Sequence, residues 1–266
     1  MVHSLAKWKR LRLKEFGIEA GKGILTDMRA LRPDEDFTPL HSIYVDQWDW
    51  EKHIKATERT LSCLKETVTR IYEVLKETEQ EVEKTYPEIK AVLPDQIEFV
   101  HAEDLLQTYP SLTPKQRETA IAKKYGAVFV IGIGGRLSDG SIHDGRAADY
   151  DDWSTQTEPE HFGLNGDILL WHPVLECAFE VSSMGIRVDK DALLKQLKEK
   201  DCEERAELLF HRMLLDGQLP ESIGGGIGQS RVCMFMLKRT HIGEVQVGIW
   251  PEKEKKQMEK SGVHLL

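Results

Sequence analysis

A run of glycines beside an arginine is the strongest chemical signal in this sequence. The segment 224–231 reads GGGIGQSR, and a helix is expected over 230–239. Because glycine has no Cβ, a ligand can lie directly against the backbone. Arg231 falls in the first helical turn, where free N–H groups and the helix dipole favour an anion. The segment has neither a P-loop lysine nor the context of a dinucleotide fold. A flexible turn before a core helix is the alternative, and the arginine favours a nucleotide site.

An expected hairpin offers a second group of polar side chains. Strands are expected over 23–32 and 41–50, joined by the polar loop 33–39. The period of two puts Gln47 and Asp49 on one face, where burial without partners would be costly. Arg32 ends the facing strand, so a guanidinium and a carboxylate can converge there, as an amino-acid ligand requires. The hairpin alone is equally consistent with an exposed sheet face.

Acidic residues and hydroxyls gather at the expected ends of later strands. The segment 180–187 reads EVSSMGIR, and acidic residues precede it at Asp167 and within 149–152. Carboxylates at strand ends suit Mg²⁺, which prefers oxygen ligands and accompanies phosphates. The sequence does not show which of these carboxylates converge, and solvated loops are the commoner explanation of such runs. The segment GIGGR at 132–136 is a weaker candidate for a phosphate cradle.

The composition narrows the class of protein. With 266 residues, 40% of them hydrophobic, the chain can build a sizeable core. It has no apolar run of membrane-spanning length and no secretory signal, so no membrane is expected. The scattered cysteines form no CxxC pair, which favours a reducing, cytoplasmic location. A net charge of −9 argues against a nucleic-acid partner. Residues 1–32 nevertheless carry five more basic than acidic residues, which suits a small anion.

The expected elements combine into one domain. Helices are expected over 4–15, 51–84, from Thr113 onward and over 189–216 with a break near Asp201. Further strands are expected over 97–101, 127–133, 167–171, 175–183 and 242–249. Hairpins with helices inserted between them indicate an α+β fold, a mainly antiparallel sheet flanked by helices.

Together these segments resemble the ammonia-dependent asparagine synthetase family. The matching stretches run from His3 to Pro251 and include HSLAKWKR, ALRPDED, HSIYVDQWDW, GAVFVIGIGG, DYDDWS, SSMGIRVD, GGGIGQSR and HIGEVQVGIWP. Ordered matching along nearly the whole chain is more specific than any single motif. The resemblance implies a catalytic core like that of class II aminoacyl-tRNA synthetases. ALRPDED with its return strand would be the second motif of that class, and GGGIGQSR the third.

The resemblance implies a two-step ligation. ATP activates the side-chain carboxylate of L-aspartate as β-aspartyl-AMP, and ammonia then releases AMP and L-asparagine. The implied catalytic residues are Arg32, Gln47 and Arg231. Asp49 would pair the substrate ammonium, and its carboxylates would be held by Lys9, Ser183 and Arg187. The nucleotide would contact His3, Glu35, Ser42, Gly226, Gly228, Ser230 and Arg231. Mg²⁺ would bridge phosphate oxygens, with Asp167 and Glu180 as candidate ligands.

One departure from the family pattern keeps other functions open. Family members carry an N-terminal helix, a first motif and an acidic loop before HSLAKWKR, and the helix and motif support a homodimer. We therefore expect 1–266 to be a single catalytic domain without that part, which leaves a sheet edge unpaired. A non-catalytic nucleotide-binding paralogue is the alternative. A tRNA ligase core for aspartate or asparagine is a weaker one, since no anticodon-binding domain fits in the chain.

Overall fold

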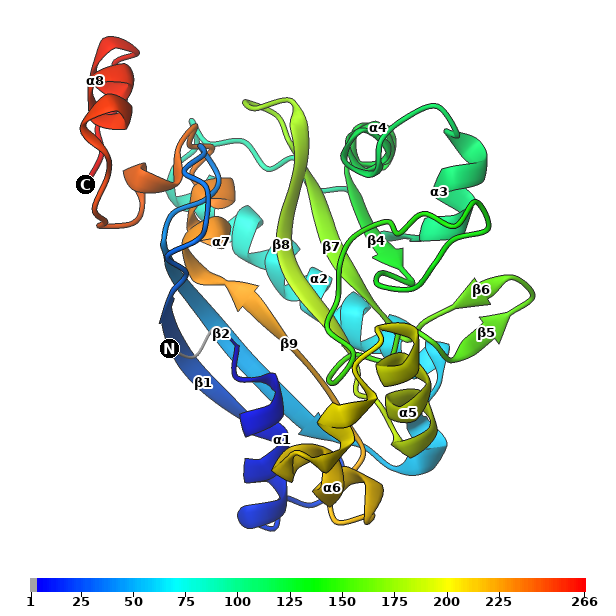
Figure 1. Cartoon of the computed structure of the whole chain (residues 1–266). Helices are drawn as coiled ribbons and strands as arrows, with labels where there is room; N and C mark the ends of the chain where they lie inside the picture. Colours follow the sequence, from blue (N-terminus) through cyan, green and yellow to red (C-terminus); the bar gives the residue numbers. More distant parts are fainter. Residues whose placement is uncertain (1–3) are drawn as a thin grey trace.

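A seven-stranded sheet forms the centre of the computed structural model, which describes residues 4–266 (Figure 1). The strand order is β1-β2-β9-β8-β7-β4-β3, and only the β3–β4 pair is parallel. These strands are β1 (Gly23–Leu31), β2 (Tyr44–His53), β3 (Glu98–His101), β4 (Ala127–Ile131), β7 (Asn165–His172), β8 (Cys177–Ile186) and β9 (Ser222–Gly228). A separate hairpin joins β5 (Gln156–Glu158) to β6 (His161–Phe162). The expected α+β class is confirmed.

Helices cover both faces of the sheet. They are α1 (Ala6–Glu15), α2 (Leu61–Thr85), α3 (Ala102–Thr108), α4 (Pro114–Tyr125), α5 (Lys190–Glu199), α6 (Leu209–Leu215), α7 (Gln229–Met236) and α8 (Glu252–Lys260). α2 runs behind the sheet, whereas α1 and α4 lie in front of it (Figure 1). α2 and α7 share one core with β8, and α3 and α4 share a second with β4. Within residues 4–266, no helix has the length and apolarity that a membrane crossing needs.

The second strand is longer than its sequence pattern suggests. A helix was expected from residue 51, but Glu51–His53 continue β2 and pair with β9. The helix begins only at Leu61, where the Thr60 hydroxyl accepts the N–H of Cys63 as an N-cap. Hydrogen bonds to β9 therefore outweigh the helical pattern at Glu51–His53, and residues 54–60 form a connection with a 3₁₀ turn at Ala56–Glu58. This extension carries Glu51 onto the same sheet face as Asp49.

The glycine segment forms a central strand. β9 lies between β2 and β8, so a flexible turn is the wrong interpretation. A Cβ on Gly225 would lie 2.6 Å from the carbonyl oxygen of Ser183 and 2.5 Å from the Met184 Cβ. Glycine is therefore required for the close approach of β8. The strand expected over 242–249 is also wrong, because this segment makes a 3₁₀ turn at Ile242–Glu244 and then a loop.

Other local expectations are confirmed. Thr113 and Gln116 form a reciprocal capping box at the start of α4, with Pro114 in the first turn. The helical stretch expected over 189–216 breaks after α5, where Asp201 has a positive φ of 50°. These features depend on neighbours within a few residues, which is why the sequence predicts them.

Candidate active site

Two adjoining pockets lie over the sheet where β2, β8 and β9 meet. The first, here the tip pocket, is bounded by residues near the β1–β2 connection and α7: Arg32, Glu35, His41, Ser42, Ser230 and Arg231. The second, here the α1 pocket, is bounded by Lys9, Asp49, Arg146, Tyr150, Asp151 and Arg187. Both pockets are lined by Arg32, Gln47, Glu180, Ser183 and Gly226. Arg32 and Arg231, far apart in the sequence, therefore border one crevice.

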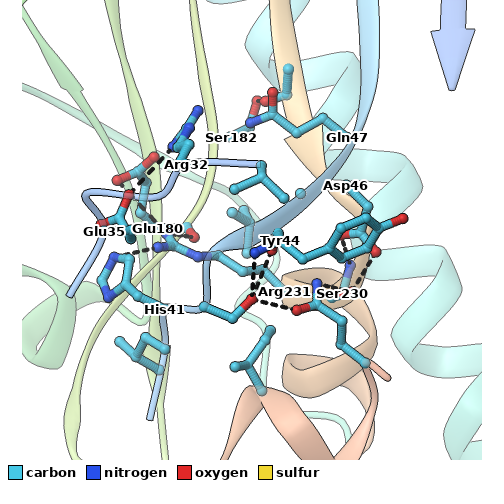
Figure 2. Close-up of a pocket in the computed structure, with 18 of the residues that line it drawn as sticks. Arg32, Glu35, His41, Tyr44, Asp46, Gln47, Glu180, Ser182, Ser230 and Arg231 are labelled. Carbon is cyan, nitrogen blue, oxygen red and sulfur yellow. Dashed lines mark hydrogen bonds and ion pairs between the residues drawn. The ribbon is translucent and has the colours of Figure 1, made fainter. Parts of the chain in front are cut away.

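Two guanidinium groups enter the tip pocket: Arg231 is held by hydrogen bonds to uncharged acceptors, and Arg32 has a distant ion pair (Figure 2). Arg231 donates to the carbonyl oxygen of Glu180 at 2.9 Å and to Nε2 of His41 at 2.7 Å. Burial lowers the pKa of His41, and Arg231 lowers it further, so the neutral ring acts as an acceptor. The only ion pair of Arg32 among the described residues is with Glu35, at 3.9 Å. Arg32 can therefore turn toward an anionic ligand, whereas Arg231 would exchange an uncharged acceptor for the anion.

A hydrogen-bonded group of side chains forms one wall of the tip pocket. The Asp46 carboxylate accepts the N–H and the hydroxyl of Ser230, at 3.0 and 2.5 Å. Gln246 accepts the Ser42 hydroxyl at 2.6 Å and donates to the Ser230 hydroxyl at 2.9 Å. Asp46 thus already occupies the N-terminus of α7, where the sequence analysis placed a ligand anion. A ligand phosphate is better served by the arginine side chains.

The glycines of β9 make room for side chains of the site. A Cβ on Gly226 would lie 2.9 Å from the Gln47 amide oxygen. A Cβ on Gly224 would lie 2.1 Å from the Glu51 carboxylate and 2.7 Å from Arg187. Polar side chains of neighbouring strands therefore lie flat across β9.

Lys9 crosses from α1 to the floor of the α1 pocket. Its buried ammonium pairs with Asp49 and donates to the carbonyl oxygens of Trp50 and Gly225, at 2.9 and 3.0 Å. These three acceptors match the three protons of the group. Burial lowers the pKa of Lys9, and Arg187 adds to this effect, while nearby acids oppose it. Lys9 thereby ties α1 to β2 and β9.

Arg187 is buried between two carboxylates. Its Nε and Nη2 donate to Glu51 at 3.0 and 2.8 Å, and its Nη1 pairs with Asp151. Burial opposes ionisation of Glu51, but Arg187 outweighs it and the pKa of Glu51 is lowered. Burial raises the pKa of Asp151 despite the same arginine. The Ser222 hydroxyl donates to Glu51 at 2.7 Å, which completes a fully hydrogen-bonded cluster.

Arg146 connects the long loop after β4 to the sheet. Its Nη2 donates to both Asp167 oxygens, at 2.6 and 2.5 Å, and lies 3.4 Å from the Ser183 hydroxyl. Asp167 is buried behind this arginine and lines neither pocket. Burial raises the pKa of Asp167 to about 6, although Arg146 opposes the shift.

The donor set for a metal ion is sparse. Glu180 lines both pockets, whereas the Asp167 carboxylate is bound by Arg146. Among residues 4–266, no three His, Cys, Asp or Glu side chains are grouped to hold a metal. Of the two candidate ligands, Glu180 could reach a metal ion in the crevice, and Asp167 could do so only if Arg146 moved away.

Most predicted site residues meet in this crevice. Those that line one or both pockets are Lys9, Arg32, Glu35, Ser42, Gln47, Asp49, Glu180, Ser183, Arg187, Gly226, Gly228, Ser230 and Arg231. His3 lies outside the described residues.

Several lining or supporting residues were not predicted: His41, Asp46, Glu51, Arg146, Tyr150 and Gln246. Asp151 belongs to the acidic run at 149–152 that was considered for Mg²⁺, and it pairs with Arg187 instead. The alternation of Gln47 and Asp49 extends to Glu51, so a longer strand assignment would have found that residue. No local signal marks the others as members of one site.

The architecture is that of class II aminoacyl-tRNA synthetase catalytic cores. Asparaginyl-tRNA synthetase from Entamoeba histolytica superposes with a TM-score of 0.64 at 14% identity, over 92% of this chain and 55% of that one. The aspartyl-tRNA synthetase of the same organism superposes with a TM-score of 0.66 at 14% identity, over 92% of this chain and 50% of that one. A third match is the asparaginyl-tRNA synthetase from Pyrococcus horikoshii, complexed with asparaginyl-adenylate. Its TM-score is 0.62 at 16% identity, over 91% of this chain and 54% of that one. At these identities the likeness shows the fold alone, and it confirms the predicted class II core.

Sequence comparison identifies the family within that fold. A family model described as aspartate-ammonia ligase matches residues 1–262. The chain is 58% identical to the aspartate–ammonia ligase of Parabacteroides distasonis, over all of this chain and 77% of that one. It is 56% identical to the one of Bacteroides fragilis, over all of this chain and 77% of that one. It is 55% identical to the aspartate–ammonia ligase of Clostridium perfringens, over all of this chain and 76% of that one. The chain belongs to the aspartate–ammonia ligase family, and the predicted resemblance is confirmed.

Proposed function

We propose that this chain carries out the ligase reaction of its family, making L-asparagine from L-aspartate, ATP and ammonia. The observation that carries the proposal is the shared wall of the two pockets at Arg32, Gln47 and Ser183. An amino acid in the α1 pocket and a nucleotide in the tip pocket would meet there. In the first step, a side-chain carboxylate oxygen bonds to the α-phosphorus and pyrophosphate leaves. In the second, ammonia attacks the acyl carbon, AMP leaves and a proton is lost.

Charge neutralisation is the main task of the tip pocket. A carboxylate and a triphosphate repel each other, so cationic groups at the junction lower the barrier to their reaction. Arg32 stands at this junction, and its ion pair within residues 4–266 is the distant one with Glu35. We assign Arg32 to bridge the α-phosphate and the carboxylate. Arg231 would bind the nucleotide, together with Glu35, Ser42, Gly226, Gly228 and Ser230 along the same pocket. No side chain needs to act as a nucleophile, so positioning carries the chemistry.

The α1 pocket offers charges of both signs for a zwitterion. We assign the substrate ammonium to Asp49, whose Oδ2 has no protein partner among residues 4–266. Gln47 would orient the reacting carboxylate, and Ser183 would donate to a substrate carboxylate. Lys9 and Arg187 are already fully paired within the protein. Their positive charges would attract the substrate carboxylates at longer range, or their N–H groups would be shared between the present acceptors and the substrate.

Mg²⁺ and the assembly belong to this proposal as well. Mg²⁺ bound to the phosphates would reduce their negative charge, with Glu180 as its protein ligand and Asp167 as a second ligand after release from Arg146. A homodimer is proposed from the family resemblance, and a cytoplasmic location from the scattered cysteines, which form no CxxC pair. No nucleic acid takes part, in keeping with the net charge of −9.

Product analysis tests the proposal. The chain is incubated with ATP, L-aspartate and ammonium, and AMP and asparagine are quantified. We expect both to form in equal amounts and only when all three substrates are present. Calorimetric ATP binding without AMP formation would favour the non-catalytic paralogue instead. Retardation of tRNA in a gel at moderate salt would revive the tRNA ligase alternative.

A further inference from the structure

The loop between β4 and β5 supplies one wall of the α1 pocket. Residues 132–155 form this loop, and three of them, Arg146, Tyr150 and Asp151, line the pocket. A connection of this length without regular structure is unusual in a compact domain, and such loops are commonly functional. None of residues 132–155 lines the tip pocket. The loop therefore contacts the amino-acid end of the crevice and not the nucleotide end.

A glutamine side chain holds three backbone groups of this loop, while Asp149, Asp151 and Asp152 pair with other elements through their side chains. Gln196 lies on α5 and is fully buried. Its Nε2 donates to the carbonyl oxygens of Ala148 and Asp151, each at 3.0 Å. Its Oε1 accepts the N–H of Trp153 at 2.8 Å. One amide thus satisfies three backbone groups in the segment 148–153, which contains the pocket residues Tyr150 and Asp151.

The backbone bonds of this loop to β8 do not duplicate the role of Gln196. The N–H of Val188 binds the Tyr150 carbonyl, and the N–H of Asp152 binds the Ile186 carbonyl, each at 2.9 Å. The groups held by Gln196 are different ones, and they are buried, so their loss would leave them unpartnered. Two donors and one acceptor are needed. Glutamate lacks the two N–H donors, and leucine lacks the donors and the acceptor.

We propose that Gln196 is a positioning residue that places the 148–153 segment for aspartate binding and leaves ATP binding untouched. The inference rests on the function proposed above. Asp151 pairs with Arg187, and Tyr150 packs its ring 5.9 Å from the same guanidinium. A shift of the segment therefore displaces a cation that faces the substrate carboxylate. Small displacements at a reacting centre have large kinetic effects.

The test compares two ligands in variants at one position. Gln196→Leu and Gln196→Glu are measured for ATP affinity by calorimetry and for the aspartate KM in the AMP-release assay. We expect the aspartate KM to rise by about tenfold or more, while ATP affinity stays within about twofold of wild type. Lys195→Met is the matched control. In the wild type, the Lys195 ammonium on the same helix donates to the Ser154 carbonyl at the end of the loop, at 2.8 Å. The substitution removes this bond, and the aspartate KM and the ATP affinity should both stay unchanged.

Each other outcome overturns the inference. Equal weakening of both ligands in the Gln196 variants would indicate a general structural role, as would failure of both variants to fold in thermal melts. An unchanged aspartate KM would show that the loop needs no such anchor. Failure of the proposed function is recognised separately, because the wild-type chain would then release no AMP with aspartate and ammonium.

Discussion

The two pockets of the crevice differ in how their charges are held. In the tip pocket, the Arg32 side chain is 38% exposed and its ion pair with Glu35 spans 3.9 Å. Arg231 is hydrogen-bonded to uncharged acceptors, the Glu180 carbonyl and His41, and its nearest carboxylate contact spans 3.8 Å. In the α1 pocket, Lys9 and Arg187 are at most 4% exposed and are paired by several hydrogen bonds. Loose cations can follow a phosphate group whose charge moves during reaction. Paired, buried charges instead fix the shape of a small site before the ligand arrives.

This difference separates stability from binding. Buried pairs are costly to break because an uncompensated charge is left in a low-dielectric region. Exposed or loosely paired cations contribute little to folding, so they are available for ligands. Substitutions in the α1 pocket should therefore affect folding and aspartate binding, whereas those in the tip pocket should affect mainly nucleotide binding and have only small effects on folding.

The largest effect is expected from Glu51→Gln. It removes the carboxylate that holds Arg187 and faces Lys9, so the free energy of unfolding should fall by about 3–5 kcal/mol. Glu35→Gln is the control in the tip pocket, where the pair with Arg32 spans 3.9 Å and the loss should be below about 1 kcal/mol. Urea unfolding gives both values, and equal losses would erase the proposed distinction.

Arg231→Ala should nearly abolish nucleotide binding. Loss of charge-assisted hydrogen bonds predicts an ATP affinity reduced by about 100-fold, with the fold intact. Calorimetry measures the affinity, and circular dichroism checks the fold. Arg29→Ala on β1, where the side chain is 67% exposed, should leave ATP affinity unchanged. Wild-type affinity in Arg231→Ala would remove this arginine from the site.

Asp49→Asn should weaken aspartate by about tenfold more than ATP. The neutral amide can no longer attract an ammonium, and the tip pocket lies beyond its reach. Aspartate KM and ATP affinity are compared in one preparation. Equal loss for both ligands would indicate a folding defect, because Asp49 also pairs with Lys9.

The smallest effect concerns acid sensitivity in the tip pocket. The pKa of His41 is lowered by burial and by Arg231, so the unfolded state binds a proton more readily than the folded state. The free energy of unfolding should therefore decline as the pH falls below the ordinary histidine pKa of about 6.5. In His41→Gln, whose amide oxygen can still accept from Arg231, this part of the decline should vanish. Urea midpoints across this range test it, and an identical decline in both proteins would exclude His41 as its source.

Sequence reasoning succeeded where the determinants are local. The capping box at Thr113 and the alternation of Gln47 and Asp49 depend on neighbours a few residues away. Local motifs also singled out Arg231 and the segment 180–187 that contains Ser183, whereas family resemblance supplied the roles of these residues and further pocket residues such as Lys9 and Ser42. It placed Asp167 among possible metal ligands, whereas its carboxylate is bound by Arg146.

Failures arose where distant segments decide the structure. Helical spacing over 51–60 could not reveal that Glu51 pairs with β9, because the partner strand lies far along the chain. Glycines at 224–226 resembled a loop, although their role is to let Glu51 and Gln47 lie across a central strand. Asp151 and Gln196 meet only through the folded loop, with no spacing pattern that links them.

We propose that aspartate and ATP react in one crevice, and the transfer of an oxygen atom from the aspartate side chain to AMP tests this proposal most directly. L-Aspartate labelled with ¹⁸O in its side-chain carboxylate is converted with ATP and ammonium, and the AMP is analysed by mass spectrometry. If that carboxylate attacks the α-phosphorus beside Arg32, each AMP formed carries one ¹⁸O atom in its phosphate. AMP without the label would contradict the account, since the acid and the nucleotide would then not have been joined in this site.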